Sequence, residues 1–87
     1  SICEIKFEEK TATEVHNFVR GLSPYPAAWA NLTIHGQVFE NVKIFEVEIA
    51  DKGALVVPCK EGAVSIKEIQ VPGKKRMDIK SFLNGLH

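Results

Sequence analysis

The chain has 87 residues, which is enough for one small domain with a modest hydrophobic core but not for two. Its composition, 45% hydrophobic and 25% charged, is typical of an ordinary globular protein, and no apolar run approaches the roughly 20 residues needed to cross a bilayer. The formal net charge is zero, but residues 1–50 carry a net −3 and residues 51–87 a net +3, so any basic face belongs to the second half.

A strand and a helix are predicted at the start of the chain. Hydrophobic and charged residues alternate over 3–7, the period of a half-buried strand. Thr11 and Glu14 then form the two ends of a capping box. The apolar residues that follow have the spacing of one helical stripe: Val15, Phe18, Val19 and Leu22. Gly21 is placed to end this helix, and Pro24 prevents its extension.

The middle of the chain is predicted to form strands that curl. After an ordered Pro24–Pro26 segment, alternation around Leu32 and Ile34 indicates a strand that ends in a His35-Gly36 turn. The buried face then changes phase twice: Val42 and Ile44 give way to Phe45, Val47 and Ile49, and Val64 and Ile66 give way to Ile69 and Val71. A β-bulge or a strand curling around a barrel leaves this pattern, so we predict a small barrel and not a flat sheet.

Shorter elements are predicted between and after these strands. They are a turn over 51–53, a short buried strand over 54–57, and a hairpin turn at Glu61-Gly62. A last helix is predicted to begin at Asp78 as its N-cap, with Met77 and Phe82 as a hydrophobic staple.

No residue pattern in the chain predicts catalysis. The histidines have no metal-ligand spacing, and neither a P-loop nor a serine nucleophile elbow is present, so we predict no catalytic residue, no cofactor-binding residue and no metal site. Cys3 and Cys59 are predicted to be reduced, buried thiols, which suits a cytoplasmic setting. Because the chain starts at Ser1 and its one methionine is Met77, we interpret it as a piece of a longer protein.

The strongest functional signal is a group of cations before and within the last helix. Lys74, Lys75, Arg76 and Lys80 fall within seven residues, with Asp78 among them. Such side chains contact phosphates without reading sequence, whereas a merely solvated surface is the alternative. Tyr25 and Trp29 could stack on bases, although Trp29 is also a candidate for the core.

Two stretches together resemble one protein family. Residues 15–29, VHNFVRGLSPYPAAW, are similar to a helix with the continuation Arg-(Ala/Gly)-(Leu/Phe)-x-Pro-(Trp/Tyr)-Pro-x-x-Trp. Glu61-Gly62 and residues 69–77, IQVPGKKRM, are similar to a final hairpin with a Gly-Lys-Lys-x-Met ending. Both features are typical of the C-terminal domain of methionyl-tRNA formyltransferases, and the resemblance covers essentially all 87 residues in the right order.

The resemblance implies an α+β, mainly β fold: a small oligonucleotide-binding-like (OB-like) β-barrel with an N-terminal helix and a short C-terminal helix. It also implies a role in translation initiation, where the full-length enzyme transfers a formyl group from 10-formyltetrahydrofolate to methionine on initiator tRNA. The catalytic Asn, His and Asp of the family lie on a preceding Rossmann-like domain, which would act in cis and is absent from residues 1–87, so no catalytic residue is carried over.

The same resemblance assigns Lys74, Lys75 and Arg76 as candidate contacts to the tRNA backbone, with Arg20 as a weaker one. Lys80 is added to these candidates because it belongs to the same group of cations in the sequence. A salt bridge between helix and barrel is the alternative role for Arg20. Two other functions stay open for the domain: the equivalent barrel of a sugar or folate formyltransferase or hydrolase, and a barrel used only for packing. No membrane partner is predicted.

Overall fold

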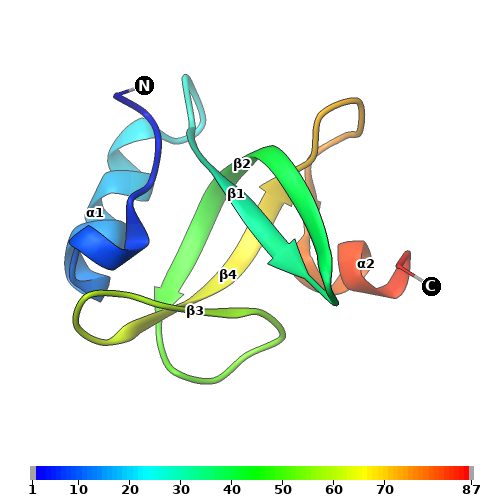
Figure 1. Ribbon diagram of the computed structural model, residues 1–87. Helices are drawn as coiled ribbons and strands as arrows, with labels where there is room; N and C mark the ends of the chain where they lie inside the picture. Colours follow the sequence, from blue (N-terminus) through cyan, green and yellow to red (C-terminus); the bar gives the residue numbers. More distant parts are fainter. Residues whose placement is uncertain (1, 87) are drawn as a thin grey trace.

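The fold is a curled antiparallel sheet with a helix on either side (Figure 1). The structure, a computed structural model, describes residues 2–86. Four strands lie in the order β1-β2-β4-β3, and a short fifth strand, β5, pairs with β4. The elements are η1 (Phe7–Glu9), α1 (Ala12–Leu22), β1 (Ala28–Ile34), β2 (Gln37–Ile49), β3 (Val56–Pro58), β4 (Ala63–Gln70), β5 (Met77–Asp78) and α2 (Ile79–Asn84). The predicted class, a mainly β, barrel-like fold with an N-terminal and a short C-terminal helix, is confirmed, and the sheet forms a half-barrel.

The helix α1 begins at the predicted capping box. The Thr11 hydroxyl accepts a hydrogen bond from the backbone N–H of Glu14 (3.1 Å), and the Glu14 carboxylate accepts one from the N–H of Thr11 (2.8 Å). All four residues of the predicted apolar stripe face the core: Val15 and Val19 are buried, and Phe18 and Leu22 are partly buried. A local sequence signal is therefore enough to fix where this helix starts and which face it buries.

The end of α1 differs by a small amount from the prediction. The helix passes Gly21 and ends at Leu22. Ser23 is extended, as expected for a residue that precedes a proline, and its N–H still donates to the Val19 carbonyl (3.0 Å). Pro24, and not Gly21, thus decides where the helix stops.

Both predicted phase switches are bulges, and they lie at the same place in the sheet. β2 and β4 are aligned at Lys43↔Gln70, Ile44↔Ile69, Glu46↔Glu68 and Val47↔Ile66. Phe45 is therefore an extra residue in β2, and Lys67 an extra residue in β4. Each extra residue moves the following side chains to the other face of its strand. One prediction from this pattern is wrong: Ile49, the last residue of β2, is 50% exposed and not buried.

Two of the predicted strands differ from the structure: one is absent, and the other is shifted and shorter. Residues 3–7 form no strand: one parallel bridge joins Glu4 to Trp29, and the chain then turns into η1. The alternation is still correct as a burial pattern, because Ile5 and Phe7 are buried. The strand predicted over 54–57 corresponds to β3, which has only three residues and ends at Pro58. It was predicted to be buried, but its residues are only partly buried or exposed. The hairpin turn before β4 is confirmed, with Cys59 N–H donating to the Gly62 carbonyl (2.9 Å).

A single core fills the half-barrel. It is made of side chains from α1, α2, the inner face of the sheet and the N-terminal segment, among them Ile5, Val15, Val19, Ala28, Ile34, Ile44, Val64, Ile66, Ile69, Ile79 and Phe82. The predicted N-cap of α2 is confirmed, since Asp78 Oδ1 accepts from the N–H of Ser81 (2.8 Å). Phe82 holds α2 on the sheet through an edge-to-face contact with Phe39, with ring centroids 5.3 Å apart.

The two cysteines are less buried than predicted. Cys3 and Cys59 form no disulfide, and both are only partly buried. Partial burial raises the pKa of the Cys59 thiol, because removal from water disfavours the thiolate.

Candidate nucleic-acid interface

The loop between β4 and β5, residues 71–76, presents two of the predicted cations to solvent. Its backbone is fixed by two hydrogen bonds: Lys74 N–H donates to the Val71 carbonyl (3.0 Å), and Gln70 Nε2 donates to the Lys74 carbonyl (2.9 Å). The side chains of Lys74 and Lys75 are exposed. Within residues 2–86, no carboxylate lies within 4.0 Å of either ammonium group. The loop is thus a fixed support for two uncompensated charges.

Arg76, the third predicted cation, is already engaged within the fold. Its Nε lies 2.6 Å from Glu68 Oε1, and the same carboxylate oxygen also contacts its Nη2. The guanidinium carbon lies 4.2 Å from the centroid of the Phe45 ring. The planar guanidinium brings two nitrogens to the carboxylate while it stacks on the ring, a combination that a lysine, with its single ammonium group, could not reproduce. Arg76 therefore ties the end of the loop to the bulge in β2.

Lys80 lies in acidic surroundings. It lines a groove of about 560 Å³ in which four carboxylates, those of Glu46, Glu48, Glu68 and Asp78, outnumber the two lysines, Lys80 and Lys67, and Lys67 is paired with Glu48 (3.9 Å). The N–H of Ser81 donates to the Asp78 carboxylate and lowers the pKa of that carboxyl. An anionic ligand at Lys80 would meet these carboxylates, so Lys80 is less suited to phosphate than Lys74 and Lys75.

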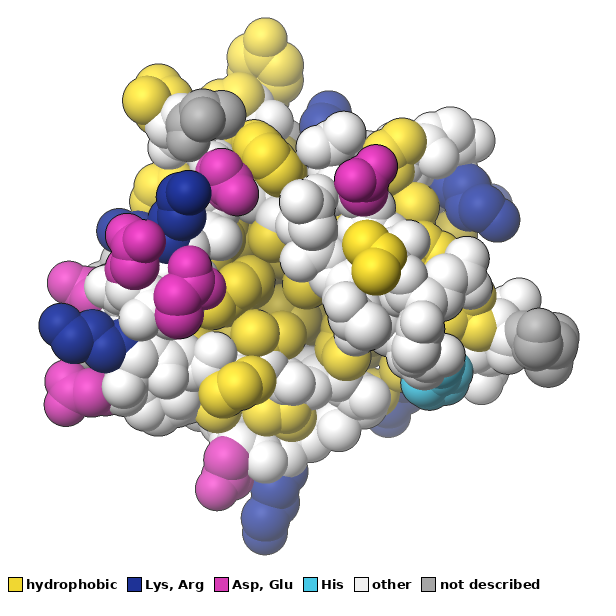
Figure 2. All heavy atoms as spheres, viewed as in Figure 1, with side chains coloured by type: hydrophobic (Ala, Val, Ile, Leu, Met, Phe, Trp, Pro, Cys, Tyr) yellow, Lys and Arg dark blue, Asp and Glu magenta, His cyan; other side chains and the backbone are white. Residues whose placement is uncertain are grey.

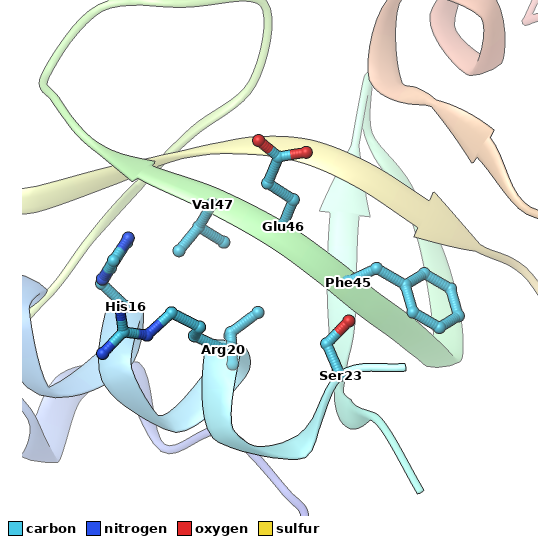
Figure 3. A pocket seen from close by; sticks show the side chains of 7 residues that line it. His16, Arg20, Ser23, Phe45, Glu46 and Val47 are labelled. Atoms are coloured by element: carbon cyan, nitrogen blue, oxygen red, sulfur yellow. The ribbon is translucent and has the colours of Figure 1, made fainter. Parts of the chain in front are cut away.

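Arg20 lies on a different part of the surface, in a cavity of about 370 Å³ between α1 and β2. Figure 3 shows His16 and Arg20 next to each other on α1, across from Val47, while the Glu46 carboxylate points away from them. The salt bridge considered for Arg20 does not form with any carboxylate of residues 2–86. Phe45, whose ring carries the Arg76 guanidinium, also lines this cavity.

Charges of both signs cover the opposite part of the molecule. Figure 2 shows acidic and basic side chains interleaved over η1 and α1, on the left of the view. This agrees with the net negative charge of residues 1–50. The described part of the chain holds no group of three or more His, Cys, Asp or Glu side chains placed to bind a metal ion. Likewise, none of its helices is long and apolar enough to cross a membrane.

Sequence reasoning missed three residues of this region. Glu68 and Phe45 hold Arg76, and Lys43 lies on the outer face of the sheet, aligned with Gln70. A signal for Lys43 was available, because it stands between the inward-facing Val42 and Ile44. No local signal marks Glu68, whose partner is eight residues away, beyond the loop 71–76 that separates β4 from β5.

Comparisons with known proteins agree on one family. The whole chain, residues 1–87, matches the family model described as formyl transferase, C-terminal domain. The chain is similar to the methionyl-tRNA formyltransferase of Azobacteroides pseudotrichonymphae genomovar. CFP2, with 42% identity over 100 residues that cover 97% of this chain and 30% of the relative. It is also similar to the enzymes of the same name from Porphyromonas gingivalis (38% over 98 residues, 95% and 30% covered) and Macrococcus caseolyticus (43% over 84 residues, 88% and 27% covered).

The chain spans less than a third of the length of these relatives.

Proposed function

Because the chain belongs to the formyl transferase C-terminal domain family, we propose that it is the tRNA-holding domain of a methionyl-tRNA formyltransferase. The observation that carries the proposal is the loop 71–76. Its backbone is anchored at Lys74, and the ammonium groups of Lys74 and Lys75 are exposed and have no carboxylate partner within residues 2–86. Fixed, uncompensated cations are the side chains that contact nucleic-acid phosphates.

In this proposal the five predicted cations have unequal roles. Lys74 and Lys75 make the main phosphate contacts. Arg76 positions their loop, because its guanidinium is committed to Glu68 and to the Phe45 ring. Lys80 contributes less, because four carboxylates line the same groove. Arg20 also contributes less, because it lies on a different part of the surface, between α1 and β2.

The chemistry belongs to another part of the full-length protein. A preceding catalytic domain in cis would bind 10-formyltetrahydrofolate and transfer its formyl group to the methionine of initiator tRNA in the cytoplasm, at the start of protein synthesis. This barrel, which we interpret as OB-like, would hold the tRNA by its backbone without reading its sequence. The similarity to enzymes named methionyl-tRNA formyltransferase supports this division, as does the fraction of their length that the chain spans.

A packing-only role is the second candidate, and one observation favours it. Glu46, Glu48, Glu68 and Asp78 line the groove beside the loop together with Lys67 and Lys80, so the groove has an excess of negative charge, which repels a polyanion. The two functions differ in a measurable way, because only the first predicts tRNA binding that weakens with salt.

The test is a titration of the 87-residue chain with tRNA at several salt concentrations. We expect a Kd of about 10⁻⁴–10⁻⁶ M, the range of purely electrostatic binding. Replacing both lysines (Lys74→Ala with Lys75→Ala) should weaken binding. It should also reduce the slope of log K against log salt by up to about 1.8, since each phosphate contact contributes about 0.9.

A matched control variant removes the same number of positive charges from another part of the surface. Lys52 and Lys60 are exposed, in the loop after β2 and in the β3–β4 turn, at the edge of the molecule opposite to the loop 71–76 (Figure 1). The double variant Lys52→Ala with Lys60→Ala should leave the salt slope unchanged. Equal slopes for the two double variants would remove Lys74 and Lys75 from the interface.

A further inference from the structure

A row of outward-facing side chains crosses the sheet next to the loop 71–76. Trp29 of β1 is aligned with Lys43 of β2, and Lys43 with Gln70 of β4. The adjacent aligned row, Ala28, Ile44 and Ile69, is fully buried. Because side chains alternate along strands, Trp29, Lys43 and Gln70 point away from the core. These three residues are named the outer row.

One end of the outer row meets the cationic loop. The side chain of Gln70 donates its hydrogen bond to the Lys74 carbonyl, so the last member of the row is also the anchor of the loop. Lys43 resembles Lys74 and Lys75 in being exposed, with no carboxylate of residues 2–86 within 4.0 Å of its ammonium group. The row and the loop together present three uncompensated positive charges along one path.

The other end of the outer row meets an exposed aromatic residue. Trp29 and Lys43 line a cavity of about 310 Å³, which Pro26 and Asn41 also line. Tyr25, the residue before Pro26, is 86% exposed. The loop that carries Tyr25 and the loop 71–76 both lie at the upper edge of the molecule in Figure 1, with the bend of β2 between them. An aromatic end and a cationic end thus share one side of the domain.

This combination fits a particular form of nucleic acid. Aromatic rings stack on the faces of bases, which are available only where a strand is unpaired, and cations along the same path contact its phosphates. The Asn41 amide adds a donor and an acceptor for a ribose or a base edge. A duplex offers phosphates but hides the faces of its bases, so it would use the lysines and not Tyr25.

The geometry points to a site for unpaired nucleotides of an RNA. Bases stack on Tyr25 and against the cavity wall formed by Trp29, and Lys43 leads their phosphates toward Lys74 and Lys75. The inference rests on the proposed tRNA-holding function and specifies which part of such an RNA lies on the sheet: a single-stranded segment, adjoining a paired region held by the loop.

The experiment compares two RNA probes: a single strand of about eight nucleotides that cannot fold, and a duplex of the same length. A length of about eight nucleotides lies within the ~4–16 nucleotides that one oligonucleotide-binding barrel covers. Trp29 is the only tryptophan, so its emission reports directly on the cavity. We expect the single strand, but not the duplex, to change the Trp29 emission. Tyr25→Ala should weaken single-strand binding by about fivefold or more, given the measured contribution of one stacked base, without changing duplex binding.

Matched variants separate stacking from charge. Lys43→Ala should weaken single-strand binding more than Lys52→Ala, which removes the same charge from the opposite edge. Because Tyr25 is so exposed, its replacement should leave the fold intact, which circular dichroism checks. Unchanged single-strand affinity in Tyr25→Ala, together with normal duplex binding, would overturn this inference and leave the proposed function standing. Absence of binding to both probes would overturn the proposed function and this inference with it.

Discussion

Arg76 illustrates how a residue predicted to bind a ligand is used within the fold. Its guanidinium bonds to Glu68 and stacks on Phe45, and the Arg76 and Glu68 side chains remain 45% and 29% exposed. Exposed ion pairs and cation–π contacts each contribute up to about 1 kcal/mol. Arg76 therefore stabilises the junction between loop and bulge by a modest amount.

A double-mutant cycle tests this role of Arg76. Arg76→Ala should lower the free energy of unfolding by about 1 kcal/mol, because both contacts are lost. With Glu68→Gln as the second change, the coupling energy from urea denaturation should be about 0.5 kcal/mol. Lys75→Ala, which removes a neighbouring cation with no carboxylate partner among the described residues, is the control and should leave stability unchanged. Equal effects of Arg76→Ala and Lys75→Ala would contradict the assignment.

Gly53 occupies a position that no other residue fits. Its φ is +146°, and an added Cβ would collide with the Ser65 hydroxyl and lie 3.1 Å from the Ser65 Cβ. Ser65 itself is fully buried, so it has no room to move aside. The loop after β2 can therefore lie this close to β4 only because position 53 has no side chain.

Two alanine substitutions should consequently have opposite effects. Gly53→Ala should lower the free energy of unfolding by about 1–3 kcal/mol through backbone strain and overpacking. Gly21→Ala, in α1, meets nothing within 4 Å and should raise it by about 0.5–1 kcal/mol through helix propensity. Thermal or urea unfolding measures both, and a stabilised Gly53→Ala variant would show that this loop is not packed on β4.

At the scale of elements, each helix has a carboxylate at its N-terminus. The N–H of Thr11 lowers the pKa of Glu14, and the N–H of Ser81 lowers the pKa of Asp78. The folded-state pKa of each group is thus below its unfolded value. Each cap contributes stability that is complete above about pH 5 and is lost as the pH falls through the folded-state pKa.

Acid unfolding should reveal both caps. Between about pH 5 and pH 3, the Tm of the double variant Glu14→Gln with Asp78→Asn should fall less than the Tm of the parent chain, because its caps no longer change charge. At pH 7 it should be the less stable of the two. Glu40→Gln, an exposed carboxylate on β2 that caps no helix, is the control. A parallel fall of Tm in parent and double variant would exclude the caps as the source of acid sensitivity.

The elements that local patterns determine could be predicted, and those that depend on distant partners could not. The capping box marks the start of α1, and a period-2 pattern that changes phase marks each bulge, since both signals lie within a few residues. The segment 3–7 has the alternation of a strand, but it bonds to β1 at one bridge and then turns into η1. Alternation reports burial there and does not report a ladder of hydrogen bonds.

At the scale of the whole molecule, the candidate interface could be only half predicted. The sequence places four cations close together, but the fold divides them: Lys74 and Lys75 face solvent, Arg76 is paired with Glu68, and Lys80 lies among carboxylates. That division depends on which strands are neighbours. The alignment of Trp29, Lys43 and Gln70 likewise spans 41 positions of sequence, from 29 to 70, and no local pattern contains it.

The proposed separation of tRNA holding from chemistry gives a prediction for the isolated chain. With 10-formyltetrahydrofolate and methionyl-tRNA as substrates, it should form no detectable formyl-methionyl-tRNA, because its residues show no pattern for catalysis. The full-length protein assayed in parallel is the positive control. Turnover by the 87-residue chain would contradict the assignment of catalysis to another domain.

The borders of the half-barrel have a consequence for how this domain behaves in a crowded solution. Along β1, Ile5 N–H donates to the Trp29 carbonyl and Trp29 N–H to the Cys3 carbonyl, so the N-terminal segment occupies part of that border. The opposite border, β3, has three residues and ends at a proline, which lacks an N–H to donate. A strand from another molecule would find the backbone groups of Trp29 already bonded and no N–H donor at Pro58, which limits edge-to-edge pairing at these two positions.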